Sequence, residues 1–304
     1  MSTKKQNLAT IVVFLVLVFG TAIWTLVSPK KEFSERENRA LAMIPAPSVE
    51  RCFSGKFEKD YETYLTDQFP WRDGWIGMKT AIERASFKTE TKDIYFAKED
   101  YLIEAHSQSF RGPQAAANIG YLKNFMETCV EKYGKEHVTA MIVPNAVDIL
   151  RNLLPKHAAP YDEEVYLQSI ADAMPQGTWF DSSSVLRDHM DIQLYYRTDH
   201  HWTTEAAYYV YAAWAFEKGF SPLSLSGYTK ETVTEDFYGT IDAKVGGKNK
   251  SDAIHVYKPK KKAEYQVNYV TKNETADDIY QYDYLNTRDK YSVYFGGNQS
   301  LVEV

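Results

Sequence analysis

Cysteine is scarce in this chain of 304 residues, which contains only Cys52 and Cys129. Two cysteines exclude a disulfide-rich scaffold and a cysteine-based zinc module, and we expect both to be buried free thiols. Glycine and proline are also few, at 15 and 11 residues, while hydrophobic residues make up 44% of the chain and charged residues 25%. This composition excludes a collagen-like or disordered chain.

Basic residues are fewer than acidic residues. The 35 lysines and arginines stand against 41 aspartates and glutamates, which gives a formal net charge of −6. Because the sequence shows no arginine-rich face to follow a phosphate backbone, we do not expect nucleic acid as a partner.

Aromatic residues, in contrast, are abundant, with 23 Tyr, 15 Phe and 6 Trp making up 14% of the chain. This content fits an extracytoplasmic domain that stacks on sugar rings, and it also fits a tyrosine-rich core and surface. Composition alone leaves both interpretations open.

The N-terminus contains a single long apolar run, residues 8–27, which carries no charge. As a helix this run is long enough to cross about 30 Å of hydrocarbon. Lys4 and Lys5 precede it, and no small-residue cleavage site closes it. We therefore predict an uncleaved signal anchor, with residues 1–7 as a cytoplasmic tail, residues 8–27 in the cell membrane and the remainder outside the cell.

Beyond the anchor, the sequence predicts a tether and then one α/β domain. Residues 28–56 are polar and contain Pro29, Pro45 and Pro47, as expected of a tether. Residues 57–304 alternate between helical and strand-like patterns. We predict helices over residues 57–69, 71–87, 114–132, 163–174 and 205–218, a hairpin over 94–104, and strands over 138–143 and 179–180.

Residues 195–203 concentrate the chemistry of the sequence, because Asp199, His200 and His201 lie there just before a predicted helix. In an extended turn, residues two apart point to the same side, so Asp199 can brace His201. A carboxylate holds an imidazole in the tautomer that deprotonates a hydroxyl. The alternative is a structural polar pair that caps the helix and packs on Trp202.

A metal site is a second alternative, since Asp199, His200 and His201 are ordinary zinc or manganese ligands. Such a site needs distant partners, and the other five histidines are scattered without helical spacing. We therefore predict no metal and no cofactor. The sequence also lacks a G-x-S-x-G elbow, a Walker loop and a GxGxxG motif. We interpret the serine run at residues 182–184 as a helix cap.

The Asp-His-His-Trp sequence at residues 199–202 is similar to the signature of the DHHW family of Gram-positive surface proteins. Further matching blocks lie at residues 33–39, 67–73, 143–145 and 295–298. That family in turn resembles the alginate O-acetylation proteins of the AlgJ and AlgX type. The resemblance implies an SGNH-hydrolase-like domain whose flavodoxin-like parallel sheet has flanking helices.

The resemblance also implies roles for individual residues. His201 would be the general base and Asp199 its orienting partner, with His200 as the variable middle residue of the motif. The implied substrate-binding residues are Arg197, Trp202, Asn145 and His200. The implied partners are a cell-envelope polysaccharide and a membrane-bound O-acyltransferase that donates acetyl groups, without a cofactor.

The resemblance further implies a serine nucleophile downstream of residues 296–298, whereas the sequence stops at Val304. We therefore expect a C-terminally incomplete domain, inactive as the chain ends, with the nucleophile beyond Val304. Two functions follow. The first is a membrane-anchored extracytoplasmic carbohydrate O-acetyltransferase or esterase. The second is a non-catalytic surface protein that binds glycan.

Overall fold

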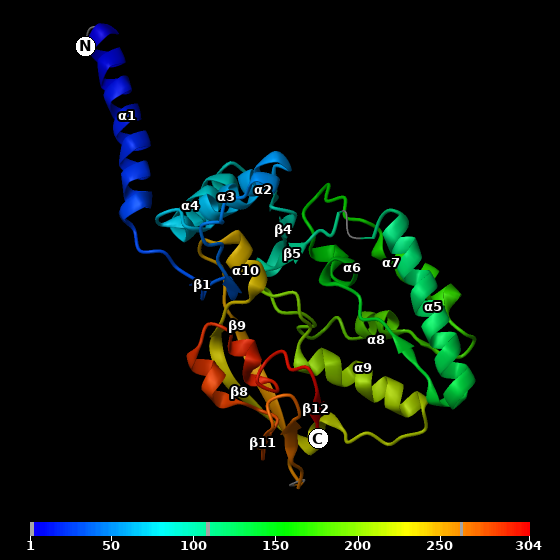
Figure 1. Cartoon of the computed structure of the whole chain (residues 1–304). Helices are drawn as coiled ribbons and strands as arrows, with labels where there is room; N and C mark the ends of the chain where they lie inside the picture. The colour runs from blue at the N-terminus through cyan, green and yellow to red at the C-terminus, as the bar shows by residue number, and fades with distance from the viewer. Residues whose placement is uncertain (1–2, 108–109, 262–263) are drawn as a thin grey trace. The chain divides into compact units, whose positions relative to one another are not determined.

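The computed structural model describes residues 3–107, 110–261 and 264–304, coloured along the chain in Figure 1. The chain divides into two compact units, Met1–Ala81 and Ile82–Val304. The predicted domain start at residue 57 lies inside the first unit, so this division tests neither the predicted tether nor the predicted domain boundaries, which stay predictions.

The first unit begins with helix α1 (Thr3–Val27), which contains the predicted apolar run. Within it, Lys4–Val27 is long and apolar enough to cross a membrane, or to serve as a signal sequence. Its large apolar side chains are mostly exposed, as the surface of a membrane-embedded or signal helix is. The orientation of the chain and its retention in the membrane stay predictions.

The rest of the first unit is a short hairpin and a group of helices. Strand β1 (Phe33–Ser34) pairs antiparallel with β2 (Arg39–Ala40). Helices α2 (Val49–Phe53) and α3 (Lys56–Asp67) follow, and α4 (Arg72–Ala85) begins in this unit. The helices predicted over residues 57–69 and 71–87 are confirmed, with the break at Pro70 as expected.

Ion pairs join the two N-terminal blocks on which the family resemblance was based. Arg39 Nη1 and Nη2 donate to Asp67 at 2.9 and 2.6 Å, and Arg72 Nη2 donates to Glu37 at 2.9 Å. The hydrogen bond from Arg39 outweighs burial and lowers the pKa of Asp67. Part of the segment expected to be a tether is therefore fastened to the end of α3.

The second unit opens with an antiparallel sheet of β3 (Glu90–Thr91), β4 (Ile94–Phe96) and β5 (Leu102–Glu104). Ile94 lies opposite Glu104, so the hairpin predicted over residues 94–104 is confirmed. Ile94, Leu102 and Ile103 are almost fully buried. The sheet therefore contributes directly to the core.

Helices and one parallel strand pair form the middle of this unit. Strand β6 (Ala140–Met141) runs parallel to β7 (Trp179–Phe180). The helices of this region are α5 (Pro113–Tyr133), α6 (Ala146–Ile149), α7 (Glu163–Ala173) and α8 (Ser182–Asp188). One core cluster packs α5 and α7 against β6, with Met126, Leu167 and Ile170 buried.

The last part of the unit contains α9 (Thr204–Glu217) and α10 (Thr240–Val245). Strand β8 (Tyr228–Phe237) pairs antiparallel with β9 (Asp252–Pro259), and β10 (Val267–Tyr269) lies between β11 (Glu274–Ala276) and β12 (Val302–Glu303). The short 3-10 helices are η1 (Lys98–Asp100), η2 (Lys135–His137), η3 (Arg151–Leu153), η4 (Leu225–Gly227), η5 (Tyr282–Asn286) and η6 (Lys290–Val293).

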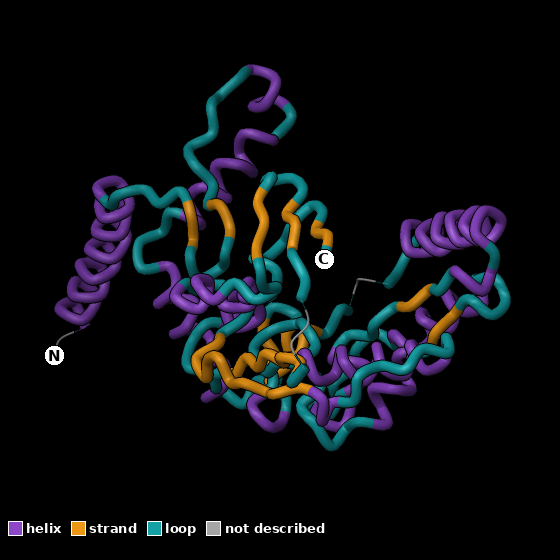
Figure 2. Tube along the Cα trace, turned by 90° about the horizontal axis from the view of Figure 1, so that it is seen from below, coloured by secondary structure: helices purple, strands orange, loops and turns teal. Residues whose placement is uncertain are grey.

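The fold is thus a mixed α/β fold in which, over the described ranges, the strands form five small separate sheets (Figure 2). Of the expected flavodoxin-like parallel sheet, only the β6–β7 pair is present among these residues. Pairing stops early because Pro144 follows β6 closely and Asp181 starts α8 directly after β7.

Both cysteines are free, as expected, but the prediction that both are buried is wrong. Cys52 is exposed because it lies on α2, a short helix without a buried residue. Cys129 is half-buried on α5.

Candidate active site

The Asp-His-His-Trp motif lies at the tip of a tight hairpin. Tyr195 pairs antiparallel with Trp202, and the Tyr196 N–H donates to the His201 carbonyl at 3.2 Å. Thr203 then caps α9, because its side chain accepts a hydrogen bond from the Ala206 N–H. The predicted turn before a helix is confirmed, and the hairpin supports the motif on both sides.

Asp199 braces His201 as the spacing predicts. Oδ1 of Asp199 accepts a hydrogen bond from the backbone N–H of His201 at 3.0 Å. The same oxygen is also hydrogen-bonded to Nδ1 of the His201 ring. Oδ2 accepts the Thr240 N–H at 2.7 Å and its hydroxyl at 3.0 Å. With its carboxylate held by four donors, Asp199 fixes the imidazole proton on Nδ1 and leaves Nε2 with a lone pair.

Asp199 is 3% exposed. Burial alone would raise its pKa, but the hydrogen bond and charge of His201 and the Thr240 amide outweigh burial and lower the pKa below its usual range. Asp199 is therefore a buried carboxylate that stays ionised beside His201.

Close approach of the backbone brings Thr240 to Asp199. A Cβ placed on Gly239 would lie 2.2 Å from the Asp199 Cβ, which no side chain tolerates. Glycine at this position therefore lets the N-terminus of α10 reach the carboxylate. Sequence reasoning did not identify Gly239 or Thr240, because no local pattern relates them to a motif some 40 residues earlier.

A second buried aspartate holds the rest of the loop. Asp252, 1% exposed on β9, accepts the Arg197 and Thr198 N–H groups at 2.9 Å each and the Thr198 hydroxyl at 2.7 Å. The Thr198 carbonyl in turn accepts N–H groups of Ile241 and Asp242. Strand β9 and helix α10 thus fix the loop from two sides. Sequence reasoning also missed Asp252.

The outer side of the motif is accessible. The His201 side chain is 38% exposed, and its ring stacks on Tyr291 at a centroid distance of 4.2 Å. The ring of His200 lies 4.0 Å away, and its Nδ1 is hydrogen-bonded to the Thr240 hydroxyl at 2.9 Å. Burial lowers the pKa of His200, which favours its neutral form.

The other predicted site residues point elsewhere. Arg197 donates to the Glu99 carbonyl at 3.1 Å and to Gln193 at 2.9 Å, and Trp202 packs against the core cluster of Leu186 and Leu194. Asn145 donates its side-chain amide to Glu163 at 3.0 Å. No hydrogen bond or ring contact joins these three side chains to His201 across the described ranges. The site brought together here is Asp199, His200, His201 and Thr240.

No serine or cysteine side chain in the described part of the chain is hydrogen-bonded to His201. The serine run at residues 182–184 begins α8, where Asp181 accepts the N–H groups of Ser183 and Ser184. Ser182 donates its hydroxyl to the Ile142 carbonyl at 2.7 Å. Asp181 is therefore the cap of α8, and the serines form the first turn of the helix. The interpretation of the serine run as the cap is wrong.

Within the described ranges, two groups of side chains have ligand atoms close enough to hold a metal ion. In the first, Asp199, His200 and His201, the four hydrogen bonds to Asp199 would have to be partly replaced by the ion. In the second, Asp148, Asp162 and Glu164, Arg151 lies 2.8 Å from Asp148 and 2.7 Å from Asp162, and Arg187 lies 2.9 Å from Asp148. Two arginines already form ion pairs with this group.

Residues 117–304 match the family model described as DHHW protein. This match covers more than half of the chain, so the chain belongs to the DHHW family. No curated protein sequence matches it.

Solved structures provide a second comparison. A DHHW family protein from Eubacterium siraeum DSM 15702 is 26% identical over 59% of this chain, with a TM-score of 0.44. Bacillus cereus PatB1 with a sulfonyl adduct is 16% identical, covering 69% of this chain and 72% of its own, with a TM-score of 0.50. The O-acetyltransferase domain of Pseudomonas putida AlgJ is 13% identical, covering 55% and 66%, with a TM-score of 0.40.

These similarities are partial. The match spans 62% of the length of the Eubacterium siraeum protein, less than two thirds. At 16% identity, the similarity to PatB1 is one of fold.

Proposed function

We propose that this chain is a membrane-anchored, extracytoplasmic O-acetyltransferase or acetylesterase of the SGNH-like type, acting on cell-envelope polysaccharide. The observation that carries the proposal is the pairing of Asp199 with His201. The buried carboxylate holds Nδ1, while the partly exposed ring leaves Nε2 free to act as a base. Membership of the DHHW family and the apolar helix α1 support it.

The proposed chemistry is acyl transfer by general base catalysis. Nε2 of His201 accepts the proton of an attacking hydroxyl while the hydroxyl oxygen bonds to the acetyl carbonyl carbon. The bond from that carbon to the departing oxygen then breaks, and the departing oxygen takes the proton back. Asp199 stabilises the imidazolium between these two steps. The final acceptor is a sugar hydroxyl in transfer and water in hydrolysis.

We propose a serine as the nucleophile that carries the acetyl group between donor and acceptor, and a membrane-bound O-acyltransferase as donor. Because His201 contacts no serine among the described residues, this serine has to be located by experiment. PatB1, whose fold is similar, was solved with a sulfonyl adduct. A sulfonyl group bound covalently to a protein marks a nucleophilic side chain, so a sulfonyl fluoride is the appropriate probe here.

The test measures, in detergent, hydrolysis of 4-nitrophenyl acetate by the full-length protein, including the nucleophilic serine of this proposal. We expect His201→Ala to lower the rate by about 10²–10⁴-fold, the usual contribution of a general base. His137→Ala is the matched control, because its side chain is 71% exposed and lies outside the site. Turnover unchanged in His201→Ala would rule the proposal out. Loss of turnover after treatment with a chelator would favour the metal site instead.

Glycan binding without catalysis is the second candidate, and a tyrosine-rich cleft favours it. The cleft, of about 750 Å³, lies between α9, the ends of β8 and β9, and residues 277–280. Tyr211 is 48% exposed and Tyr265 is 37% exposed, so both rings are accessible. The tyrosines that line the cleft are Tyr208, Tyr211, Tyr228, Tyr257, Tyr265 and Tyr280. Asp277 and Lys260 supply polar groups for sugar hydroxyls.

Binding of chitohexaose and cellohexaose by calorimetry separates the two candidates. We expect Tyr211→Ala to weaken binding at this cleft, whereas Tyr121→Ala, on the exposed face of α5, leaves binding unchanged. Glycan binding that survives His201→Ala, in a chain without turnover, supports the second candidate. Absence of saturable binding to both oligosaccharides excludes it.

A further inference from the structure

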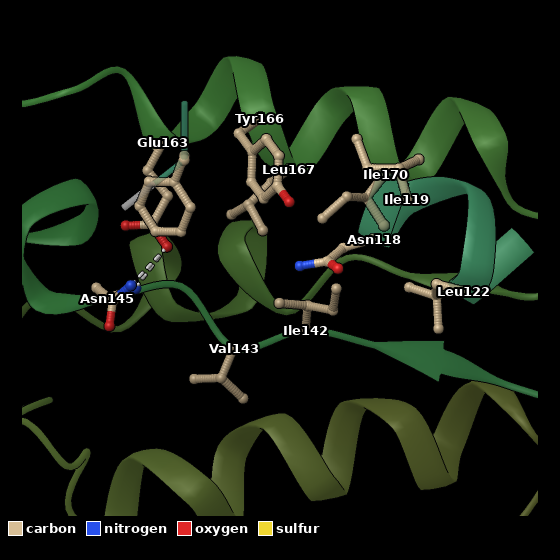
Figure 3. Close-up of a pocket in the computed structure, with 11 residues that line it drawn as sticks. Asn118, Ile119, Leu122, Ile142, Val143, Asn145, Glu163, Tyr166, Leu167 and Ile170 are labelled. Atoms are coloured by element: carbon tan, nitrogen blue, oxygen red, sulfur yellow. Dashed lines mark hydrogen bonds between the residues drawn. The ribbon is translucent and has the colours of Figure 1, made fainter. Parts of the chain in front are cut away.

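A cavity of about 290 Å³ lies in the second unit (Figure 3). Helix α5 contributes Asn118, Ile119 and Leu122, and helix α7 contributes Glu163, Tyr166, Leu167 and Ile170. Phe110 and the segment after β6, with Ile142, Val143 and Asn145, complete the lining. None of these residues belongs to the Asp199–His201 site.

The lining is unequal from end to end. Aliphatic side chains of α5 and α7 face one another at one end, as Figure 3 shows for Ile119 and Ile170, and Asn118 and Tyr166 line the middle. Glu163 and Asn145 lie together at the other end, joined by a hydrogen bond. An apolar wall with a few convergent polar groups is the usual composition of a small-molecule site.

Glu163 is unusual among the lining residues. It is 2% exposed, and only one of its two carboxyl oxygens has a hydrogen-bond partner among the described residues. Its Oε1 accepts the Asn145 N–H at 3.1 Å and the Asn145 side-chain amide at 3.0 Å. Its Oε2 is buried and, among the described residues, has no hydrogen-bond partner. A buried carboxyl oxygen without a partner costs free energy that a bound polar group can recover.

The chemistry of Oε2 indicates which group would pair with it. Burial raises the pKa of Glu163 by more than the two hydrogen bonds from Asn145 lower it. The protonated form therefore persists to a higher pH than is usual for a glutamate. A protonated carboxyl needs an acceptor, whereas a carboxylate needs a donor. A hydroxyl group can serve as either one. An ammonium group would also pair with the carboxylate, but it is far more costly to transfer into apolar surroundings.

We propose that this cavity binds an aliphatic alcohol, with its hydroxyl paired to Oε2 of Glu163 and its chain against the aliphatic residues of α5 and α7. An apolar cavity of about 150 Å³ holds benzene, so a cavity about twice that size accommodates a chain of roughly six to eight carbons. The site is independent of the proposed acetyl transfer.

The test follows methyl NMR signals of the full chain in detergent micelles while 1-hexanol is added. We expect saturable shifts at Ile119 and Ile170, and none at Ile254, which is buried in a different core cluster. 1-Fluorohexane, which lacks the hydroxyl, is expected to bind about tenfold more weakly, because it leaves Oε2 unpaired. Equal affinity for both ligands, or no saturable shift, would overturn the proposal.

Variants locate the hydroxyl contact. Glu163→Met, which removes Oε2, is expected to bind 1-hexanol about tenfold more weakly and to lose the preference over 1-fluorohexane. Glu163→Gln should stay within about threefold of wild type, because its amide nitrogen still donates to the hydroxyl. Glu164→Met is the matched control on the same helix, since the Glu164 side chain is 62% exposed. Unchanged affinity in Glu163→Met contradicts the proposal, and the ligand comparison above remains decisive if that variant does not fold.

Discussion

Asp199 and Glu163 are two carboxyl groups of the same unit, 3% and 2% exposed, whose pKa values move in opposite directions. Four donors from two residues hold Asp199, and its pKa falls. Glu163 accepts two hydrogen bonds, both from Asn145, and its pKa rises. Burial is almost equal at the two sites, so the number of donors and the nearby imidazole decide the sign.

The difference has consequences for what each group can do. An ionised Asp199 beside His201 stabilises positive charge, which a general base needs when it accepts a proton. Glu163 has a buried oxygen without a hydrogen-bond partner among the described residues, and its side chain lines a cavity. The hairpin around Asp199 is thus the site of the proposed reaction, and the cavity at Glu163 is the site of the proposed binding.

Among the substitutions that test this difference between the two carboxyl groups, Asp199→Asn is expected to have the largest effect. Two Thr240 donors meet Oδ2, so the carbonyl oxygen of asparagine takes that place and its NH₂ group faces His201. Nδ1 of His201 must then accept, and the ring proton moves to Nε2. We expect hydrolysis of 4-nitrophenyl acetate to fall about 10²–10⁴-fold.

Imidazole ¹⁵N NMR of the same variant checks the tautomer independently of turnover. The wild type should show the proton on Nδ1 and the variant should show it on Nε2. An unchanged tautomer would mean that Asp199 does not set the state of His201.

Gly239→Ala is expected to have the next largest effect. The added Cβ would lie 2.2 Å from the Asp199 Cβ, so α10 must move away and take Thr240 with it. Such overpacking costs about 1–3 kcal/mol in the free energy of unfolding, measured by denaturant titration.

Gly120→Ala on α5 is the control for this substitution, because a Cβ there meets nothing within 4 Å. It should be neutral or stabilise by about 0.5–1 kcal/mol, the gain of alanine over glycine in a helix. Equal effects of the two substitutions would show that the backbone at Gly239 does not pack closely against Asp199.

The local half of the candidate site was predictable from the sequence. Asp199 and His201 are two residues apart, so their contact follows from turn geometry, and the threonine cap follows from the helix behind it. Gly239, Thr240 and Asp252 come from elements some 40 to 50 residues downstream, in a region where the sequence shows only strand-like pieces. Long-range hydrogen bonds of this kind leave no local pattern.

The same limit applies to the fold. Helices α3, α5 and α9 follow from hydrophobic spacing and from terminators such as Gly134, which ends α5. The parallel sheet was overestimated, because an apolar run does not reveal how many neighbours a strand has. The ion pair of Arg39 with Asp67 was also out of reach, since it joins residues 28 positions apart.

A smaller effect distinguishes Asp199 from Glu163 in the way the free energy of unfolding depends on pH. The pKa of Glu163 is higher in the folded protein than its unfolded value of 4.5. Its contribution to stability is therefore present below pH 4.5 and is lost as the pH rises through the pKa of the folded state. A lowered pKa, as at Asp199, gives stability that is present above 3.8 and is lost as pH falls below it.

Glu163→Gln isolates the first of these contributions. As pH rises above 4.5, the difference in unfolding free energy should shift towards the variant by at most about 1.4 kcal/mol per pH unit. Asp148 and Arg151, the charged groups that act on Glu163, are unchanged in this variant. Denaturant titrations across this range test the sign, with Glu164→Gln as control, and parallel curves for all three proteins would contradict it.

The smallest effect is expected for His200→Ala. The ring of His200 lies 4.0 Å from that of His201, yet its side chain is 46% exposed. Its hydrogen bond is with the Thr240 hydroxyl, which also donates to Asp199. Removing the ring leaves all four hydrogen bonds to Asp199 in place. We expect turnover of 4-nitrophenyl acetate to change by less than about tenfold and the tautomer of His201 to stay as in the wild type. A loss as large as that of Asp199→Asn would instead place His200 in the reaction itself, as a shared metal ligand or a second base.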